Sequence, residues 1–499
     1  MSQQTRAAPR EVELKLAVNE RDLTRLRQRL ARFGDAETFD VDNVYYDTGE
    51  GLLRTKRMAL RVRRIGRRWV QTLKTEARAT ALSCRGEWEV PAPRGRLDVR
   101  RFPATPLADL LQAHPGAELR PAFRTRFRRT IWLADDGAIE VALDEGEIVV
   151  GERRAPILEL ELELKSGSRD ALYRLALDLV GKGGAALALR PAVESKAVRG
   201  YRLAGGDGAV PLKANARAIA GALTPDTTLA AALRAVVGRG TTLLLANVAN
   251  VDGAADPEFI HQARVAVRRA RSAARLLRRQ AGWPAALDRD LRWIARRLGA
   301  VRDWDVMRAQ TLPALLAALP GNGETLSAEV VQLRQRDEAA LASAVADPRF
   351  ARLALRLLRW ADSPAADGGT TLAAEARRRL DRLHRRLFAS AAFFVALPLE
   401  EQHRVRIRAK RLRYALDLFA AALPAKAAAR YVADLAHLQD ELGALNDAAV
   451  AAPLVRRLAR AARLDAAPAL DWLDGRRQQH ALRAEAALAA LSRRRRPWG

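Results

Sequence analysis

Two stretches in which charged and apolar residues alternate decide how the first half of this chain folds: Glu11-Val12-Glu13-Leu14-Lys15 and Glu159-Leu160-Glu161-Leu162-Glu163-Leu164-Lys165. Successive side chains of an extended strand point to opposite faces, so each stretch has one ionised face and one apolar face. The solvated face of an amphipathic sheet would explain either stretch alone. Two matching stretches with basic strands between them indicate instead a site where carboxylates hold metal cations and bases hold an anion.

The chain of 499 residues is strongly basic, with 86 Lys and Arg against 58 Asp and Glu and a formal net charge of +28. This excess favours a polyanionic partner, such as nucleic acid, an anionic membrane surface or a polyphosphate. The single cysteine, Cys84, excludes an internal disulfide and a multi-cysteine zinc site, which fits a reducing cytosol. Met1–Arg10 lacks the apolar core of a secretory signal. The sequence contains no run of about 18 uncharged apolar residues, so we expect no transmembrane helix.

The sequence pattern changes near residue 205. Before it, strand-like alternation is interrupted by turn signals such as Asp135-Asp136-Gly137, and residues 20–32 and 168–180 have helical periodicity. The candidate strands cover residues 11–15, 41–46, 58–64, 68–74, 86–90, 124–133, 139–144 and 157–164. Residues 205–222 are linker-like, and beyond them Ala, Leu and Arg recur with helical periodicity, punctuated by Pro284, Pro313, Pro348 and Pro398. We expect an α+β domain over residues 1–204 and an all-α domain over residues 223–499.

Basic residues of the first half alternate in the same way as the acids. The basic candidates are Arg61, Arg63, Lys74, Arg124, Arg126 and Lys196, and further acids alternate at Glu87 and Glu89 and at Glu140 and Asp144. A guanidinium fork can donate two hydrogen bonds to phosphate oxygens at once. A sheet face with so many ionised side chains cannot lie in a dry core, so the sheet is either exposed or closed into a barrel lined by charge. In a barrel, the apolar positions would face outward, toward flanking helices.

In motif and in order, residues 8–203 resemble the CYTH, or triphosphate tunnel metalloenzyme, family. The resemblance rests on Glu-x-Glu-x-Lys at 11–15, Tyr-Tyr-Asp-Thr at 45–48, Leu-Arg-Val-Arg at 60–63, Thr-Leu-Lys at 72–74, Arg-x-Glu-x-Glu at 85–89, Leu-Asp-x-Gly at 143–146 and the Glu-Leu-Glu-Leu run. It implies an eight-stranded antiparallel tunnel, with flanking helices, that binds a linear triphosphate and hydrolyses or rearranges it with Mg²⁺ or Mn²⁺.

The resemblance also implies roles for individual residues. Catalysis would involve Glu11, Glu13 and Lys15. The metal-holding carboxylates would come from Glu11, Glu13, Glu87, Asp144, Glu159, Glu161 and Glu163, and which of the last three bind metal stays open because they share one strand face. The triphosphate would contact Lys15, Arg61, Arg63, Lys74, Arg124, Arg126, Lys165 and Lys196. Phosphoryl transfer depends on neutralising charge, so neither a cysteine nucleophile nor a catalytic histidine is required, and His114 is not expected to act.

The second half contains an internal repeat. His261, Arg264 and Arg268 recur in register as His403, Arg406 and Lys410, and Leu-Gly-Ala-Val-Arg-Asp at 298–303 recurs as Leu-Gly-Ala-Leu-Asn-Asp at 442–447. This self-similarity predicts two related helical units with pseudo-twofold symmetry. Positions i, i+3 and i+7 form one stripe on a helix, where like charges repel unless an anion lies across them. One such stripe is usually a solvated face, but its repetition favours phosphate binding, and the histidines lack the partners of a metal site.

Residues 223–495 resemble the CHAD family, whose name records conserved histidines in an α-helical domain. The resemblance implies two helical bundles around a basic channel and an association with inorganic polyphosphate. The implied polyphosphate contacts are His261, Arg264, Arg268, Arg269, His403, Arg406, Lys410 and Arg411. Arg302 with Asp303, and Asn446 with Asp447, would orient these helices or contact the ligand. We expect the terminal run Arg493–Arg496 to belong to a disordered tail that adds nonspecific anion binding.

Taken together, these patterns predict a metal-dependent inorganic triphosphatase joined to a helical domain that binds inorganic polyphosphate, in the cytoplasm or at polyphosphate granules. Two alternatives remain: a non-catalytic polyphosphate-binding protein, and a tunnel enzyme that acts on thiamine triphosphate or, as an adenylyl cyclase, on ATP. Nucleic acid would bind only as a nonspecific polyanion, because aromatic residues make up 5% of the chain and none is interleaved with the basic stripes to stack on bases.

Overall fold

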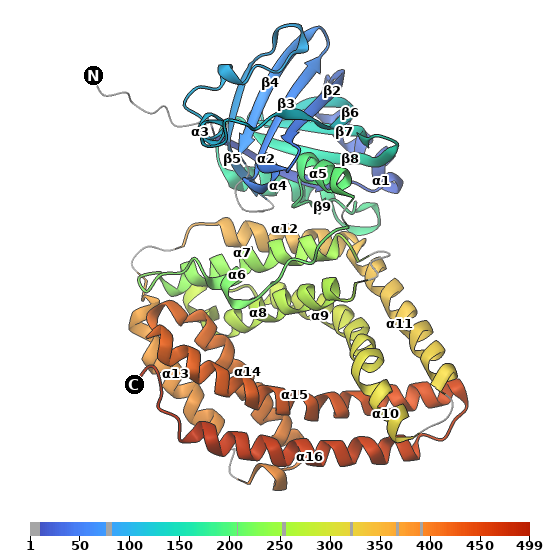
Figure 1. Ribbon diagram of the computed structural model, residues 1–499, viewed down its shortest axis with the longest axis vertical. Helices are drawn as coiled ribbons and strands as arrows, with labels where there is room; N and C mark the ends of the chain where they lie inside the picture. The colour runs from blue at the N-terminus through green and yellow to red at the C-terminus, as the bar shows by residue number, and fades with distance from the viewer. Residues whose placement is uncertain are drawn as a thin grey trace. The chain divides into compact units, whose positions relative to one another are not determined.

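The computed structural model describes residues 10–75, 82–206, 208–251, 256–319, 323–365, 369–389 and 393–499. The start of the chain, Met1–Pro9, and the side chains of Cys84 and Arg85 lie outside this description, so the expectations stated for them are not addressed. The chain divides into two compact units, one formed by Met1–Pro211 and Ala346–Asp362 and the other by Leu212–Val345 and Ser363–Gly499. Figure 1 shows the elements of both.

The first unit is an antiparallel β-barrel with flanking helices. Its strands are β1 (Arg10–Ala17), β2 (Glu37–Thr48), β3 (Met58–Ile65), β4 (Arg68–Thr75), β5 (Leu82–Pro91), β6 (Leu119–Ala134), β7 (Ile139–Val150), β8 (Arg153–Leu164) and β9 (Arg190–Pro191). Its helices are α1 (Glu20–Leu30), α2 (Leu52–Thr55), α3 (Pro106–Ala113), α4 (Arg169–Val180), α5 (Lys196–Gly205) and α12 (Pro348–Asp362).

Eight of the strands form a closed ring. The sheet runs in the order β5-β4-β3-β2-β6-β7-β8-β1-β9, and an additional pairing of β5 with β1 closes it. The expected fold class, an antiparallel barrel followed by a helical region, is confirmed. The sheet has nine strands instead of eight because β9 pairs with the end of β1. With two residues, β9 is too short to leave an alternating pattern in the sequence.

The two faces of the barrel wall have opposite polarity. On β3, Arg61 and Arg63 point inward, whereas Met58 and Leu60 point outward and pack with Leu107 of α3. On β1, Leu14 and Leu16 are fully buried on the face opposite to the charged residues, and α4 packs against β1 and β8. The apolar positions of these strands therefore face flanking helices, as expected for a charge-lined barrel.

The second unit is entirely helical in its described residues. Its helices are α6 (Ala216–Ala220), α7 (Leu229–Val248), α8 (Glu258–Ala281), α9 (Ala285–Val306), α10 (Leu312–Ala318), α11 (Gly323–Val345), α13 (Leu372–Phe388), α14 (Leu399–Leu418), α15 (Ala425–Ala462) and α16 (Ala467–Ser492). The two repeated histidine motifs lie on α8 and α14, which pack against each other. Pro284 and Pro398 precede α9 and α14, as the sequence predicts for residues that start helices.

The expectation of a disordered C-terminal tail is wrong. Arg494 is paired with Asp434, and Arg496 Nη1 lies 2.7 Å from Asp381 Oδ1. Trp498 is only 7% exposed, and its ring packs on that of Tyr431 with 5.2 Å between centroids. The tail is held because its arginines meet carboxylates of α13 and α15, and its terminal aromatic side chain is buried. These partners lie far away in the sequence, so a run of arginines gave no sign of them.

One helix, α7, is long and apolar enough to cross a membrane by length and composition, with a mean hydropathy of 1.4. About two-thirds of that stretch, 67%, is buried inside the protein. The core helix of a folded unit passes the same test, so this is weak evidence for a membrane span.

Candidate functional site

The barrel encloses a cavity of about 410 Å³ that is lined by ionised side chains. Strands distant in the sequence contribute to it because ring closure turns all their charged faces toward one space. The lining carboxylates are Glu11, Glu13, Glu87, Glu89, Glu140, Glu161 and Glu163. The lining bases are Lys15, Arg61, Arg63, Lys74, Arg129 and Lys196.

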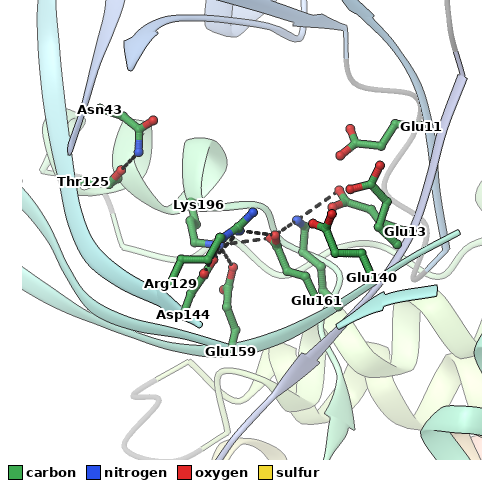
Figure 2. A network of polar contacts seen from close by, with 12 residues as sticks. Glu11, Glu13, Asn43, Thr125, Arg129, Glu140, Asp144, Glu159, Glu161 and Lys196 are labelled. Atoms are coloured by element: carbon green, nitrogen blue, oxygen red, sulfur yellow. Dashed lines mark hydrogen bonds and ion pairs between the residues drawn. The ribbon is translucent and has the colours of Figure 1, made fainter. Parts of the chain in front are cut away.

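Lys196, the first residue of α5, is enclosed by three buried carboxylates (Figure 2). Its Nζ lies 2.6 Å from Asp144 Oδ2 and 3.0 Å from Glu161 Oε1, and it also contacts Glu159. Burial alone would lower the pKa of Lys196, but the three carboxylates outweigh it and raise the pKa. Ligand oxygens of the three acids lie within 4.8 Å of one another, a grouping that could hold a metal ion. In this structure the lysine ammonium lies among them.

Two further cations complete this buried network. Arg129 donates to Asp144 Oδ1 and Oδ2 at 2.7 and 2.6 Å and to Glu161 Oε2 at 2.5 Å. Lys15 Nζ lies 2.5 Å from Glu161 Oε1 and 3.0 Å from Glu13 Oε1. Burial would raise the pKa of Glu161, but Lys15, Lys196 and Arg129 outweigh it and hold the pKa well below its usual range. Glu161 is therefore ionised and is shared by three cations.

A second set of carboxylates forms a row across three neighbouring strands. In the strand register Glu163 of β8 is opposite both Glu13 of β1 and Glu140 of β7, so the three side chains are direct cross-strand neighbours. Figure 2 shows Glu11, Glu13 and Glu140 on one side of the cavity. Burial raises the pKa of Glu163, and Glu11 and Glu140 add to this against the opposing charge of Lys165. A divalent cation would relieve this repulsion.

Three of the six lining bases, Arg61, Arg63 and Lys74, come from β3 and β4. Lys74 Nζ is 2.8 Å from Glu11 and 3.1 Å from Glu87. Burial lowers the pKa of Arg63 to about 9, and repulsion from Arg61 and Arg129 contributes. Bringing these cations together in a buried space is costly, and an anion in the cavity would compensate for it.

Three uncharged residues of the site were given no role in the sequence analysis, although Tyr45 belongs to a motif quoted there. Tyr45 lines the cavity, and its hydroxyl accepts a hydrogen bond of 3.3 Å from Arg61 Nη1. Asn43 and Thr125 are fully buried; Asn43 Nδ2 donates to Thr125 Oγ1 at 2.7 Å, and Asn43 Oδ1 accepts from Arg63 Nε at 2.9 Å (Figure 2). Asn43 thus orients Arg63. The inward positions of the strands that carry these residues were the only available signal.

Two predicted contacts are on the wrong face of the barrel. Arg124 and Arg126 are exposed on the outside of β6, where Arg124 Nη2 pairs with Asp42 Oδ2 at 2.7 Å. The inward positions of β6 are those of Phe123, Thr125 and Phe127, and the next one is Arg129, which the sequence analysis missed. Basic residues occupy both faces of this strand, so alternation of charge did not distinguish them.

The other predicted residues of the barrel lie in or beside the cavity. Asp144 and Glu159 are buried and bonded to Lys196 without lining the open space. Lys165, with 41% of its side chain exposed, pairs with Glu140 at 3.1 Å and Glu163 at 3.0 Å. The lining itself contains Glu11, Glu13, Lys15, Arg61, Arg63, Lys74, Glu87, Glu161, Glu163 and Lys196.

In the helical unit, side chains from the two histidine-bearing helices meet in one basic cluster. Arg264 and Arg268 of α8 and Arg406 and Lys410 of α14 repel one another electrostatically, and Asp447 partly offsets this. Burial lowers the pKa of Lys410 to about 7, with further lowering by the three arginines. Within the described structure the Nε atoms of Arg268 and Arg406 are buried without a hydrogen-bond partner. Such buried donors are rare unless a ligand or water satisfies them.

The remaining predicted residues of this unit divide into different settings. Arg269 Nη1 is bonded to Asp417 Oδ2 of α14 at 2.7 Å, so this residue ties the two helices together. His261 is half-buried, whereas His403 and Arg411 are exposed. A cavity of about 640 Å³ continues from the cluster between α8 and α9, lined by Arg264, Arg268, Arg271, Arg275, Arg292, Arg296 and Asp303, among others.

Family models match both parts of the chain. The model of the CYTH domain matches residues 9–201, and the model of the CHAD domain matches residues 235–456. The chain carries a CYTH domain followed by a CHAD domain. The two families and their order are those expected from the sequence, and each matched range lies within the stretch that showed the resemblance.

Two similar proteins show how far the sequence and structural similarity extends. The inorganic triphosphatase of Haemophilus influenzae is 35% identical over 173 residues, which are 33% of this chain and 47% of that protein. The match therefore spans about half the length of that relative. The crystal structure of the CHAD domain from the plant Ricinus communis is 36% identical, with a TM-score of 0.51, and the match covers 58% of this chain and 99% of the plant chain.

The contact between Asn43 and Thr125 predicts a measurable effect on stability. Thr125→Val keeps the volume of the side chain but leaves the buried Asn43 amide without its acceptor, which should lower the free energy of unfolding by about 1–3 kcal/mol. The matched control is Thr130→Val on the outside of the same strand, where Thr130 meets Thr38 at the exposed surface. Urea unfolding of both variants measures the difference. Equal effects would show that the buried hydrogen bond does not hold the Asn43 amide.

Proposed function

We propose that the CYTH barrel hydrolyses inorganic triphosphate with a divalent metal and that the CHAD helices bind inorganic polyphosphate. The observation that carries the first part is the enclosed cavity, in which guanidinium and ammonium groups face a row of carboxylates. The likeness to a Haemophilus influenzae protein named as an inorganic triphosphatase supports it. The cavity volume lies within the range of small-ligand sites.

The substrate of such a site must be a compact polyanion. Arg61 and Arg63 present guanidinium groups to the same space, and a guanidinium can donate paired hydrogen bonds to phosphate oxygens. Arg129 lines the same space, with its Nε and Nη2 bonded to Asp144 and Glu161. Tyr45 and Asn43 hold Arg61 and Arg63 in place, so the donors are arranged before a ligand arrives. A linear triphosphate fits this chemistry because its charge is spread over a chain of oxygens.

The carboxylate row is the better candidate for the metal. The row has cationic partners, Lys15 on Glu13 and Lys165 on Glu140 and Glu163, but Glu11 and Glu140 still raise the pKa of Glu163. Each acid of the trio around Lys196 instead contacts at least two cations, so that trio is already neutralised. Clustered carboxylate oxygens suit hard cations such as Mg²⁺ or Mn²⁺. When bound, the metal would neutralise phosphate charge and help to position the attacking water.

The protein's own residues would carry the rest of the reaction. Water adds its oxygen to the terminal phosphorus and gives up a proton to solvent or to a phosphate oxygen. The bridging P–O bond breaks, and the bridging oxygen leaves with pyrophosphate. Arg61 and Arg63 would bind the pyrophosphate portion and stabilise the negative charge that develops on it. Lys196 would keep its proton, because the acids around it raise its pKa, and would act as a fixed positive charge. The closed wall limits the access of bulk water.

We expect the purified protein to release phosphate from tripolyphosphate only when Mg²⁺ or Mn²⁺ is present. Glu13→Gln and Glu163→Gln should each raise the metal concentration needed for half-maximal activity by about tenfold, because each removes a charged ligand. Glu159→Gln is the matched control: it removes a partner of Lys196 and should lower turnover without changing the metal requirement.

The same phosphate-release assay distinguishes the alternatives. Tripolyphosphate, long-chain polyphosphate, thiamine triphosphate and ATP should be compared at equal concentration with each metal. A preference for either organic triphosphate would replace the proposed substrate, and no release from any of them would favour a non-catalytic barrel. A shift in metal requirement with Glu159→Gln alone would move the metal to the trio around Lys196.

The basic lining should affect binding and turnover together. Arg61→Ala and Arg63→Ala are each expected to lower kcat/KM for tripolyphosphate by about 2–4 kcal/mol, because the lost contact strengthens as charge develops on the leaving group. Arg126→Ala is the matched control, since it removes an arginine from the outer face of the same barrel. Steady-state kinetics of the three variants test this. Losses of the same size in all three would mean that net charge, and not the cavity, determines the rate.

The proposal for the CHAD helices rests on the basic cluster between α8 and α14. Four cations meet there, and two of them, Arg268 and Arg406, have buried Nε donors without a partner in the described structure. A phosphate chain would supply acceptors to these donors and relieve the repulsion. Its affinity should fall steeply as salt rises, because each phosphate contact releases counterions.

Binding of polyphosphate should depend on pH through Lys410. Its pKa of about 7 means that the free protein loses this proton progressively as the pH rises through 7, whereas a bound anion would raise the pKa. Binding therefore takes up a proton, and affinity should fall by about tenfold between pH 6 and pH 8. Calorimetric titration of the full chain with long-chain polyphosphate, in buffers of different ionisation enthalpy, measures both effects.

Lys410→Arg is the informative variant because arginine keeps its charge across this range. It should bind polyphosphate with little pH dependence, while His261→Gln should retain the dependence of the natural protein. If Lys410→Arg behaves like the natural protein, the titrating group lies elsewhere. If duplex DNA displaces polyphosphate at equal phosphate concentration, the cluster is a general polyanion surface.

A further inference from the structure

Helix α12 belongs to the barrel unit although the chain reaches it from the helical half. Residues Ala346–Asp362 group with Met1–Pro211, while the segments before and after them belong to the other unit. The CYTH family match ends at residue 201, and α12 lies inside the stretch matched by the CHAD family. The sequence analysis placed the whole of 223–499 in one helical domain. The structure thus gives the barrel a helix that its own segment of sequence does not encode.

This helix is attached to the barrel unit by apolar packing and by specific polar contacts. Phe350, Ala351 and Leu355 are buried, and α12 packs against α4 and β9. Arg359 donates to both carboxylate oxygens of Asp170 at 2.6 and 3.0 Å. The polar contacts at the two ends of the helix are Arg21 Nη2 to Ala346 O at 2.8 Å, Arg352 Nη1 to Gly181 O at 3.0 Å and Tyr173 OH to Asp362.

The strand beneath α12 completes an edge of the catalytic cavity. In the described residues, β1 pairs with β5 over residues 10–14. On the same side β9 pairs with Leu16 and Ala17, and Ala192 N donates to the carbonyl of Lys15 at 2.9 Å. The segment 190–192 thus supplies backbone partners to Lys15–Ala17 on that side, as a neighbouring strand does in a sheet. Lys15 is also the residue whose ammonium joins Glu13 to Glu161 inside the cavity.

We propose that α12 is a positioning element of the barrel: supplied by the helical half, it holds β9 against β1 and thereby keeps Lys15 and Glu13 in their places in the cavity. A strand of two residues cannot hold itself in a sheet, so its position depends on what packs over it. The effect on turnover rests on the proposed triphosphatase function, whereas the effect on β9 does not.

The test removes, in the full chain, two arginines of α12 that bond to Gly181 and Asp170. In Arg352→Ala/Arg359→Ala, hydrogen exchange in residues 187–193 and 14–18 should speed up by about tenfold or more, with β3 and β6 unchanged. With tripolyphosphate, kcat should fall by about tenfold because Lys15 and Glu13 lose their alignment. KM should change less than twofold, because Arg61 and Arg63 lie on β3, separated from β1 in the ring by β4 and β5.

Two variants serve as controls. Arg356→Ala removes an exposed arginine from the same helix and should match the natural protein in exchange and kinetics. Exchanging the pair, Asp170→Arg with Arg359→Asp, should restore the protection that Arg359→Asp alone loses.

Three results would overturn the inference: unchanged exchange in residues 187–193 of the double variant, faster exchange spread evenly over all strands, or loss of protection with Arg356→Ala. If the natural protein hydrolyses none of the triphosphates, the proposed function fails, and the exchange measurements still decide the role of α12.

Discussion

The buried contact of Lys196 with Asp144, Glu159 and Glu161 is the interaction on which the barrel depends most. It joins α5 to β7 and β8, and Arg129 and Lys15 extend it to β6 and β1. Removing one partner from such a network leaves an uncompensated buried charge, which costs about 3–5 kcal/mol. The network therefore holds together strands that would otherwise repel one another through their inner faces. It also fixes Lys15, Lys196 and Arg129 in the cavity wall before any ligand binds.

Charge is separated differently in the two halves of the protein. In the barrel, acids and bases alternate around one cavity, and nearly every carboxylate has a cationic neighbour, so the site suits a metal together with a polyanion. In the helical unit, Arg264, Arg268, Arg406 and Lys410 meet with little acidic compensation, and the cost is seen in the lowered pKa of Lys410. That arrangement suits an anion alone. The two halves of the chain therefore differ in the kind of charge that each leaves for a ligand to balance.

Much of this could be predicted from alternation and repetition. The fold class, the inward faces of β1, β3 and β8, and the two repeated basic helices follow from spacing, because side chains at period two or along one helical stripe must share a face. Arg124 and Arg126 show the limit of that reasoning. Both faces of β6 carry arginines, so only the neighbouring elements decide that Arg129 points inward. Asn43 and Thr125 carry no charge, so only their inward strand positions could have marked them.

By itself, the sequence determined which residues share a strand or helix face, and with it the chemistry available to each face. Only the tertiary structure decided which faces meet: the pairing of β5 with β1, the placement of Lys196 among three acids, the ordered tail with its buried Trp498, and the docking of α12 on α4 and β9. The physical reason is the distance along the chain between the residues that interact. Local geometry follows from neighbouring residues, whereas ring closure, buried ion pairs and helix docking depend on contacts between residues far apart in the chain, which no local pattern encodes.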